Sequence, residues 1–260
     1  MKMTRVYQCE DTLEGIFTAV YDAGKSRYGH DYIQIQVRSK DCVENLSLFQ
    51  EYVEVQADAE KAEKVLQSVR SRISEQVYRE ILIAAGSNQP DKADVIYHFI
   101  VYGFAMGGGV VNALHIPCVQ RMFEIKRRVY NEAHFFLEFL RFQEIKSEQP
   151  ALLAVFEPEN DVIAIVMNHF ADRLNPERFI IYDKTHRLAA FHSPGDSWYL
   201  RSLDVEEGQR LEDLGKRSEE TYADLWKAFF ESISIKEREN RNLQRNNLAL
   251  HYRKHMTEFQ

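Results

Sequence analysis

The sequence predicts an α+β protein of mixed helices and short β-hairpins, with a helix-rich middle and a helical C-terminus. Hydrophobic residues make up 45% of the 260 residues and charged residues 28%, the balance of an ordinary globular protein. Apolar residues alternate with a period of two near the N-terminus and again beyond residue 142, whereas the stretch between follows helical spacing. Because the helical and hairpin parts are separate along the chain, the α+β class is favoured.

Residues 1–90 are predicted to form strands and helices. Residues 11–27 place apolar side chains at helical spacing after Asp11, a residue type that caps helices, and Glu14 follows three positions later. Residues 59–85 predict a second helical stretch, interrupted near Ser71–Ser74. Short stretches of alternating hydrophobicity predict strands at residues 4–11, 31–39 and 51–58.

The middle of the chain is predicted to be helical. Residues 90–106 form an amphipathic to buried stretch that Gly107–Gly109 should end. Residues 117–142 keep apolar side chains on one broad face and begin with Pro117, a residue favoured in the first turn of a helix.

Beyond residue 142 the pattern predicts two hairpins with a helix between them. The first hairpin turns at Lys146–Pro150, and the second turns near Lys184 and Thr185. Residues 161–174 between them have helical spacing, and so do residues 219–235 near the C-terminus.

No repeat, linker or composition break divides the sequence. It is therefore predicted to be a single compact unit over 1–260, with sub-regions at 1–90, 91–142, 143–200 and 201–260. The three cysteines are widely spaced and form no C-x-x-C pair, so neither a disulfide framework nor a zinc site is predicted. No stretch approaches the ~20 apolar residues of a membrane span, and the N-terminus lacks the apolar region of a secretory signal. We expect a cytoplasmic protein with reduced thiols, and no membrane association, metal or cofactor is expected.

The stretch "NHFADRLNPERFIIYDKTHR", residues 168–187, gathers several polar side chains. His169 continues the apolar stripe of residues 162–166 at helical spacing, and Asp172 and Arg173 share its side of the helix. Asp172 could therefore orient His169 as a general base. The alternative is a histidine at the edge of the core, next to an ion pair at the helix end.

Asp183 and Arg187 flank the turn of the second predicted hairpin. Aspartate commonly starts such turns by accepting hydrogen bonds from backbone amides. In the functional interpretation, Arg187 and His192 face a phosphate or a base, and Asp183 fixes them.

Cys9, Glu10 and Asp11 close a predicted strand and open a helix. A thiol near a helix N-terminus has a lowered pKa, so Cys9 could be reactive. The alternative is a small packing residue.

The C-terminal stretch 235–260 is basic, although the net charge of the chain is −7. Arg238, Arg241 and Arg245 recur at helical spacing, and "HYRKHMTEF" adds Arg253 among aromatic residues. Arginines interleaved with aromatic rings suit phosphate contacts and base stacking. The alternative is a solvated helix followed by an anchored tail.

Three long blocks of the sequence resemble one bacterial family. They are "YQCEDTLEGIFTAVYDA", "NHFADRLNPERFIIYDKTHRLAAFH" and "LWKAFFESISIKEREN" with "HYRKHMTEF". The family consists of DNA-metabolism or DNA-repair proteins of unknown biochemical function. Their genes sit beside a radical-SAM protein, and in some bacteria the domain is fused to a uracil-DNA-glycosylase-like domain. The resemblance implies a biological context and assigns no catalytic residues.

Three functional hypotheses follow. The first is an accessory protein of DNA repair or modification that acts with the radical-SAM partner and contacts DNA through the basic C-terminal stretch. The second is an enzyme acting on a nucleotide or a nucleic-acid base, with His169 as general base and Asp172 and Asp183 as orienting groups. The third is a protein–protein scaffold.

Overall fold

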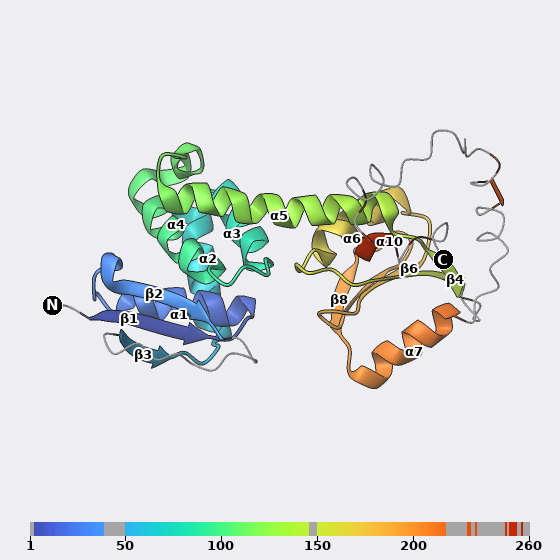
Figure 1. The fold of residues 1–260 in the computed structure, drawn as a ribbon, viewed down its shortest axis with the longest axis horizontal. Coiled ribbons are helices and arrows are strands. Elements are labelled where there is room, and N and C mark those ends of the chain that lie inside the picture. The colour runs from blue at the N-terminus through green and yellow to red at the C-terminus, as the bar shows by residue number, and fades with distance from the viewer. Residues whose placement is uncertain are drawn as a thin grey trace. The chain divides into compact units, whose positions relative to one another are not determined.

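The structure, a computed structural model, shows an α+β protein (Figure 1), as the sequence predicts. The chain divides into two compact units, Met1–Val129 and Tyr130–Gln260. The boundary between the units falls inside the long helix α5 (Pro117–Phe139). Because this helix is continuous across the boundary, the composition of the sequence does not change there. The structure describes residues 3–38, 50–145 and 150–216, with short pieces at 228–229, 232, 248, 250–253 and 256.

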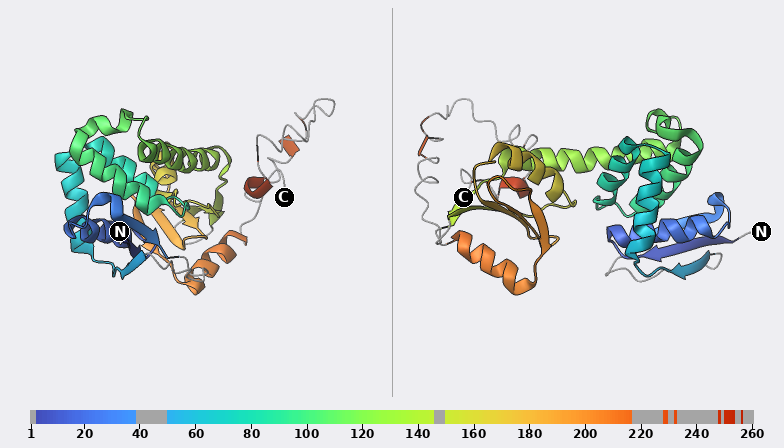
Figure 2. Two further views of the ribbon diagram at one scale, coloured as in Figure 1. Left: turned by 60° about the vertical axis from the view of Figure 1, so that its left-hand side comes forward. Right: turned by 180° about the vertical axis from the view of Figure 1, so that it is seen from behind.

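The sheet of unit 1 contains β1 (Thr4–Cys9), β2 (Ile33–Val37) and β3 (Gln50–Glu54), which confirms the three predicted strands. All of its pairings are parallel, in the order β2-β1-β3. The helix α1 (Leu13–Lys25) makes the crossover from β1 to β2, followed by the short 3-10 helix η1 (His30–Tyr32). Helices lie on one side of this sheet (Figure 2), while Gln34 and Gln36 of β2 are exposed.

The other helices of unit 1 begin and end close to the predicted positions. Ser74 accepts a hydrogen bond from the Val77 amide and so caps the second half of the long helical stretch, which is interrupted as predicted. Gly107, at a φ of 65°, ends the next helix in a conformation that favours glycine. The helices are α2 (Ala59–Arg72), α3 (Glu75–Ala85), α4 (Lys92–Met106) and the 3-10 helix η2 (Gly107–Asn112).

The N-terminus of α1 differs from the prediction by one residue. Thr12 is the cap, because its hydroxyl accepts a hydrogen bond from the Gly15 amide at 3.0 Å. Asp11 is therefore left to pair with another side chain, the ammonium of Lys92.

Among the described residues, one helical stretch, Lys92–Asn112, has the length and the apolar composition that crossing a membrane requires. Its Ala93, Ile96 and Phe99 are buried in the core of unit 1. A central helix of a protein core has the same composition.

Unit 2 contains a mixed sheet in the order β4-β5-β6-β7-β8. The β4–β5 and β6–β7 pairs are antiparallel and confirm the two predicted hairpins, whereas β8 was not predicted. The β5–β6 pair is parallel, and α6 makes the connection between these strands. The elements are β4 (Gln143–Ile145), β5 (Ala151–Phe156), α6 (Ile163–Arg173), β6 (Phe179–Asp183), β7 (Leu188–His192) and β8 (Tyr199–Ser202).

The two faces of this sheet carry different helices. Helix α7 (Val205–Lys216) covers one face, and α6 with the short helix α10 (Leu250–Arg253) lies on the other (Figure 1). Side chains alternate along β6, so Asp183 shares the α6 face with Phe179 and Ile181, whereas Tyr182 packs in the cluster under α7. Most of the predicted C-terminal helix at 219–235 lies outside the described residues.

Candidate active site

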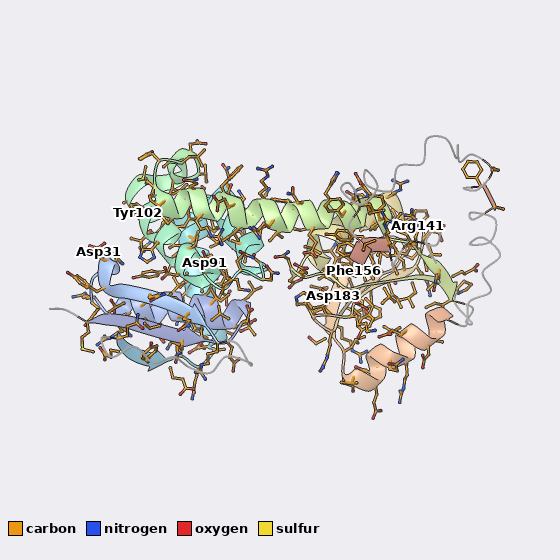
Figure 3. The ribbon with its side chains drawn as sticks, in the orientation of Figure 1. Asp31, Asp91, Tyr102, Arg141, Phe156 and Asp183 are labelled. Carbon is orange, nitrogen blue, oxygen red and sulfur yellow. The ribbon has the colours of Figure 1, made fainter. Side chains whose placement is uncertain are left out.

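The candidate site of unit 2 lies where two parallel strands end. Phe156, the last residue of β5, pairs in register with Asp183, the last residue of β6 (both are labelled in Figure 3). Loops that follow neighbouring parallel strands leave the sheet at the same edge, which is where α/β sheets commonly bind ligands. The segments that meet here are the loop after β5 and the turn after β6.

Asp183 and His186 form the centre of the site. The Asp183 carboxylate is fully buried, and its Oδ1 accepts a hydrogen bond from the His186 amide at 3.0 Å. Its Oδ2 lies 2.7 Å from Nδ1 of the His186 ring. The ring is 30% exposed, and its Nε2 has no hydrogen-bond partner among the described residues. Asp183 therefore fixes the ring through one nitrogen and leaves the other for proton exchange.

The surroundings of His186 favour its charged form. Burial of the ring lowers its pKa, but the hydrogen bond that the ring donates to Asp183 and the charges of Asp183, Asp161 and Glu132 outweigh burial, so the pKa is raised above its usual value. The imidazolium form of His186 is therefore more stable than that of a histidine in water.

Glu132 holds the loop after β5. This glutamate of α5 is only 6% exposed. Its carboxylate accepts hydrogen bonds from the amides of Glu159 and Asn160 at 2.6 and 2.8 Å, and from the Asn160 side chain. Hydrogen bonds to an ionised acceptor are strong, so these donors hold the loop to α5.

Tyr252 connects the C-terminal segment to the site. Its ring stacks on Phe135 at 4.8 Å and meets Phe136 edge-on at 5.1 Å. Burial, followed by the charges of Glu132 and Glu159, raises the pKa of the Tyr252 hydroxyl, which stays protonated at neutral pH. We call Asp183, His186, Glu132, Asn160 and Tyr252 the Asp183 cluster.

The Asp183 cluster has the chemistry of an acid–base site. A buried carboxylate orients a histidine, and the histidine can take a proton and transfer it. Among the residues that the structure describes, no group of three or more His, Cys, Asp or Glu side chains could hold a metal ion.

The predicted pairing of His169 with Asp172 does not occur. His169, Asp172 and Arg173 are all exposed, so His169 does not continue the buried stripe of α6. Its ring packs edge-on against the neighbouring Phe170, and among the described residues it makes no hydrogen bond to either aspartate. Asp172 instead borders a separate hollow of about 400 Å³, beside Trp198.

The second hairpin separates the groups that were predicted to act together. Arg187 is exposed at a φ of 55° in the turn after Asp183. His192 pairs with Phe179 at the opposite end of β6 and is buried, with its Nδ1 2.9 Å from the Glu177 carbonyl oxygen. Arg187 and His192 therefore do not face one ligand.

The predicted N-terminal group lies in unit 1. Burial, followed by the charge of Asp11, raises the pKa of the Cys9 thiol to about 12, so the lowered pKa expected at a helix start is absent. Asp11 pairs with the buried ammonium of Lys92 at 2.5 Å. Glu10 and Asp11 border an open crevice of about 870 Å³.

Three of the predicted DNA-contacting arginines, Arg238, Arg241 and Arg245, lie outside the described residues. Arg253 lies in α10 and is partly buried. Its guanidinium approaches the Leu248 carbonyl oxygen at 3.5 Å, so it contributes to the local structure of the C-terminal segment.

Four members of the Asp183 cluster are not predicted from the sequence: His186, Glu132, Asn160 and Tyr252. A signal existed for two of them. His186 follows Asp183 by three residues in one turn, and Glu132 lies between Val129 and Phe136 at helical spacing, on the buried face of α5. No local pattern indicates Asn160 or Tyr252, because their partners are distant in the sequence.

Comparison with known proteins places this cluster within a family. Residues 90–258 match the family described as a domain of unknown function (DUF4130). The chain belongs to this family. The whole Asp183 cluster falls within the matched residues, whereas the sheet of unit 1 precedes them. No curated protein matches the chain.

Proposed function

We propose that this DUF4130 protein acts in DNA repair or modification in the cytoplasm, together with a radical-SAM protein, and that unit 2 carries out an acid–base step. The biological context is what the sequence resemblance implies. The observation that carries the acid–base role is the fully buried Asp183 hydrogen-bonded to the partly exposed ring of His186.

In this role each residue of the cluster has a distinct task. Neutral His186 accepts a proton at Nε2 from a water molecule as the water oxygen attacks a nucleotide or a nucleic-acid base, and the imidazolium returns the proton to the leaving group. Asp183 orients the ring and stabilises the imidazolium. Glu132 positions the loop after β5, and the Tyr252 phenol remains a hydrogen-bond donor. His186 takes the role that the sequence assigned to His169.

The acid–base role can be tested in cells that produce the protein with its radical-SAM neighbour. Nucleosides released from the DNA of these cells are compared by mass spectrometry between the wild type, His186→Gln and His169→Gln. We expect His186→Gln to abolish any change in nucleoside composition that the wild type causes, and His169→Gln to preserve it. An unaltered profile for His186→Gln, at equal protein level, would refute the acid–base role.

The predicted DNA contact is a separate part of the proposal. It is supported by the spacing of Arg238, Arg241 and Arg245 in the basic C-terminal stretch. Each phosphate neutralised adds about −0.7 to the slope of log affinity against log salt for a single strand, or about −0.9 for a duplex. We expect the combined Arg→Gln variant at these three positions to flatten the slope by about two units for a single strand and by almost three for a duplex. No binding to single or double strands at low salt would refute the DNA contact.

A further inference from the structure

Unit 1 contains a second candidate site, a hollow of about 330 Å³ between α1, α2 and α4. We call it the aromatic pocket, because rings from α1, η1 and α4 border it. Its lining includes Tyr21, Gly24, His30, Lys64, Tyr97 and Phe104.

The walls of the aromatic pocket suit a planar ring. Tyr21 is partly buried and Tyr97 is fully buried, whereas Phe104 is 49% exposed next to the hollow. Val20, Val65 and Ile100 complete an apolar floor. Apolar and aromatic surfaces with a few polar groups are typical of ligand sites, and aromatic side chains of this kind stack on the faces of bases.

A histidine ring held by a tyrosine lies at one side of the pocket. The Tyr97 hydroxyl is 2.8 Å from Nδ1 of His30, its hydrogen-bond partner among the described residues. Burial, followed by the charges of Tyr7 and Asp94, raises the pKa of Tyr97, so the phenol keeps its proton. Nδ1 of His30 is engaged by this phenol, so Nε2 is the ring nitrogen that can donate to a ligand or accept from it, according to the tautomer.

A cation borders the pocket. Lys64 is the cation among the lining residues, and its pair with Glu60, at 3.6 Å on the exposed side of α2, is of the weak surface kind. The Lys25 ammonium lies 5.9 Å from the centre of the Tyr21 ring. An anionic group on the ligand would find Lys64 at the mouth of the pocket.

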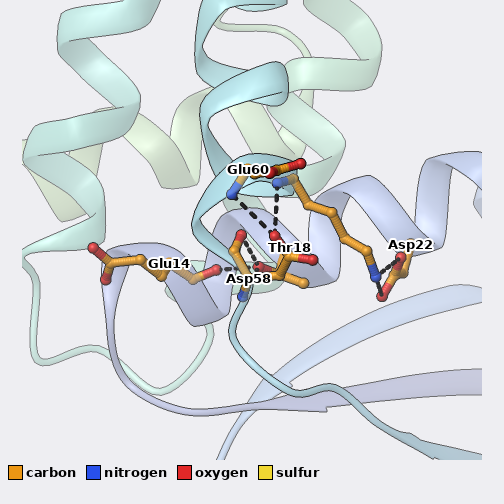
Figure 4. Close-up of polar contacts among 6 residues, drawn as sticks. Glu14, Thr18, Asp22, Asp58 and Glu60 are labelled. Carbon is orange, nitrogen blue, oxygen red and sulfur yellow. Dashed lines mark hydrogen bonds and ion pairs between the residues drawn. The ribbon is translucent and has the colours of Figure 1, made fainter.

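Two of the pocket walls are held together before any ligand binds. The Thr18 hydroxyl of α1 accepts from the Asp58 amide at 3.0 Å, and the Asp58 carboxylate caps α2 (Figure 4). Lys61 of α2 reaches back to Asp22 of α1 at 2.9 Å (Figure 4). These contacts fix α1 against α2, so the pocket is preformed and binding requires little ordering.

We propose that the aromatic pocket binds a nucleotide, with the base among the aromatic rings, a polar atom of the base at His30 and the phosphate at Lys64. An apolar ligand would leave the His30 ring nitrogen and the cation unused, and a single-ring acid would fill only part of the volume. The nucleotide is either free or one unit of a single strand. The inference does not depend on the acid–base role of His186.

Gly24 allows a clean test. It borders the pocket within α1, and a Cβ added to it meets no atom within 4 Å. Gly24→Leu should fill the hollow, while Gly24→Ala should leave it open. Both substitutions improve helix propensity, so neither should lower the melting temperature.

The measurement is calorimetric titration of the full chain with nucleoside 5′-monophosphates, a short oligothymidylate and indole-3-acetate. We expect nucleotides to bind the wild type and Gly24→Ala equally, and Gly24→Leu to abolish binding. Lys64→Gln should weaken the binding of monophosphates about tenfold, the loss expected for one charged contact, and should leave the affinity for the parent nucleosides unchanged. His186→Gln should bind as the wild type does.

The comparison of monophosphates with the oligonucleotide identifies the source of the nucleotide. Monophosphates that bind while the oligonucleotide does not would indicate a free nucleotide, whereas tighter binding of the oligonucleotide would indicate a strand. Absence of nucleotide binding at millimolar concentration, retained binding by Gly24→Leu, or indole-3-acetate binding as tight as the nucleotides would each overturn the assignment.

Discussion

Removal of the Glu132 carboxylate is the sharpest test of how the Asp183 cluster is held. Glu132→Ala deletes the acceptor of three hydrogen bonds, from two backbone amides and the Asn160 side chain. Asn160 is 5% exposed, so its two donors to Glu132 lie away from water, whereas exposed Glu159 can turn to water. A hydrogen bond to a charged group contributes about 1.5–3 kcal/mol.

Loss of the two hydrogen bonds from Asn160 to the carboxylate should therefore lower the free energy of unfolding of unit 2 by at least about 3 kcal/mol. Glu132→Gln keeps the shape and one acceptor oxygen, so about half of this loss is expected. The matched control is Glu138→Ala in the same helix, because Glu138 makes an exposed i,i+4 pair with His134 and should cost about 0.5 kcal/mol or less.

The assay is urea unfolding combined with amide hydrogen exchange at residues 159 and 160. Local exchange is needed because a chain of two units need not unfold in one step. With a slope of about 1.5 kcal/mol per molar urea, the Glu132→Ala midpoint for unit 2 should fall by about 2 M. If the urea midpoint of Glu132→Ala equals that of Glu138→Ala within error, or if amide exchange at residue 160 is unchanged, Glu132 does not hold the loop after β5.

Three further predictions concern single groups. Asp183→Asn should lower the pKa of His186 in an NMR titration, because it removes the charge that stabilises the imidazolium. Since the pKa of His186 is raised in the folded protein, the wild-type pair should stabilise the fold fully below about pH 6.5 and lose this contribution as the pH rises through the folded pKa. Asp183→Asn should flatten this pH dependence of stability. An unchanged His186 titration in the variant would contradict the prediction. Cys9 should resist iodoacetamide at pH 8 until unit 1 unfolds, because its thiol is buried with a pKa of about 12, and fast labelling of the native protein would show otherwise. Asp58→Ala should lower the stability of unit 1 by about 1 kcal/mol in urea unfolding through loss of the α2 cap, and no change would argue against it.

The elements that local chemistry defines could be predicted from the sequence. Pro117 begins α5, Gly107 ends α4, and Ser74 separates α2 from α3. Each acts through a neighbour within a few residues, so a window of sequence contains the whole cause. The two hairpins could be predicted for the same reason.

His169 shows how a small error in a helical pattern changes a functional assignment. The predicted stripe contained residues 162, 165, 166 and 169, whereas the buried residues of α6 are Ile163, Val166, Met167 and Phe170. A shift of one residue rotates the face by about 100°. That rotation buries Phe170 and exposes His169. His169 therefore lacks the buried position that the prediction gave it, and the candidate general base is His186.

The remainder of the site depends on pairing between distant segments. The parallel register of β5 with β6 brings Asp183 beside the loop that Glu132 holds, and Glu132 precedes Asn160 by 28 residues. Neither partner carries a local sign of the other, because buried hydrogen bonds of this kind form only once the sheet and α5 have packed.

The family match separates the two places at which chemistry is proposed. The matched residues, 90–258, contain the whole Asp183 cluster, whereas α1 and α2, two walls of the aromatic pocket, lie outside it. Only the α4 wall, with Tyr97 and Phe104, falls within the match. A relative that contains only the matched segment should therefore keep the acid–base pair and lack the nucleotide pocket. Nucleotide affinity in such a relative equal to that of this chain would show that α1 and α2 do not form the site.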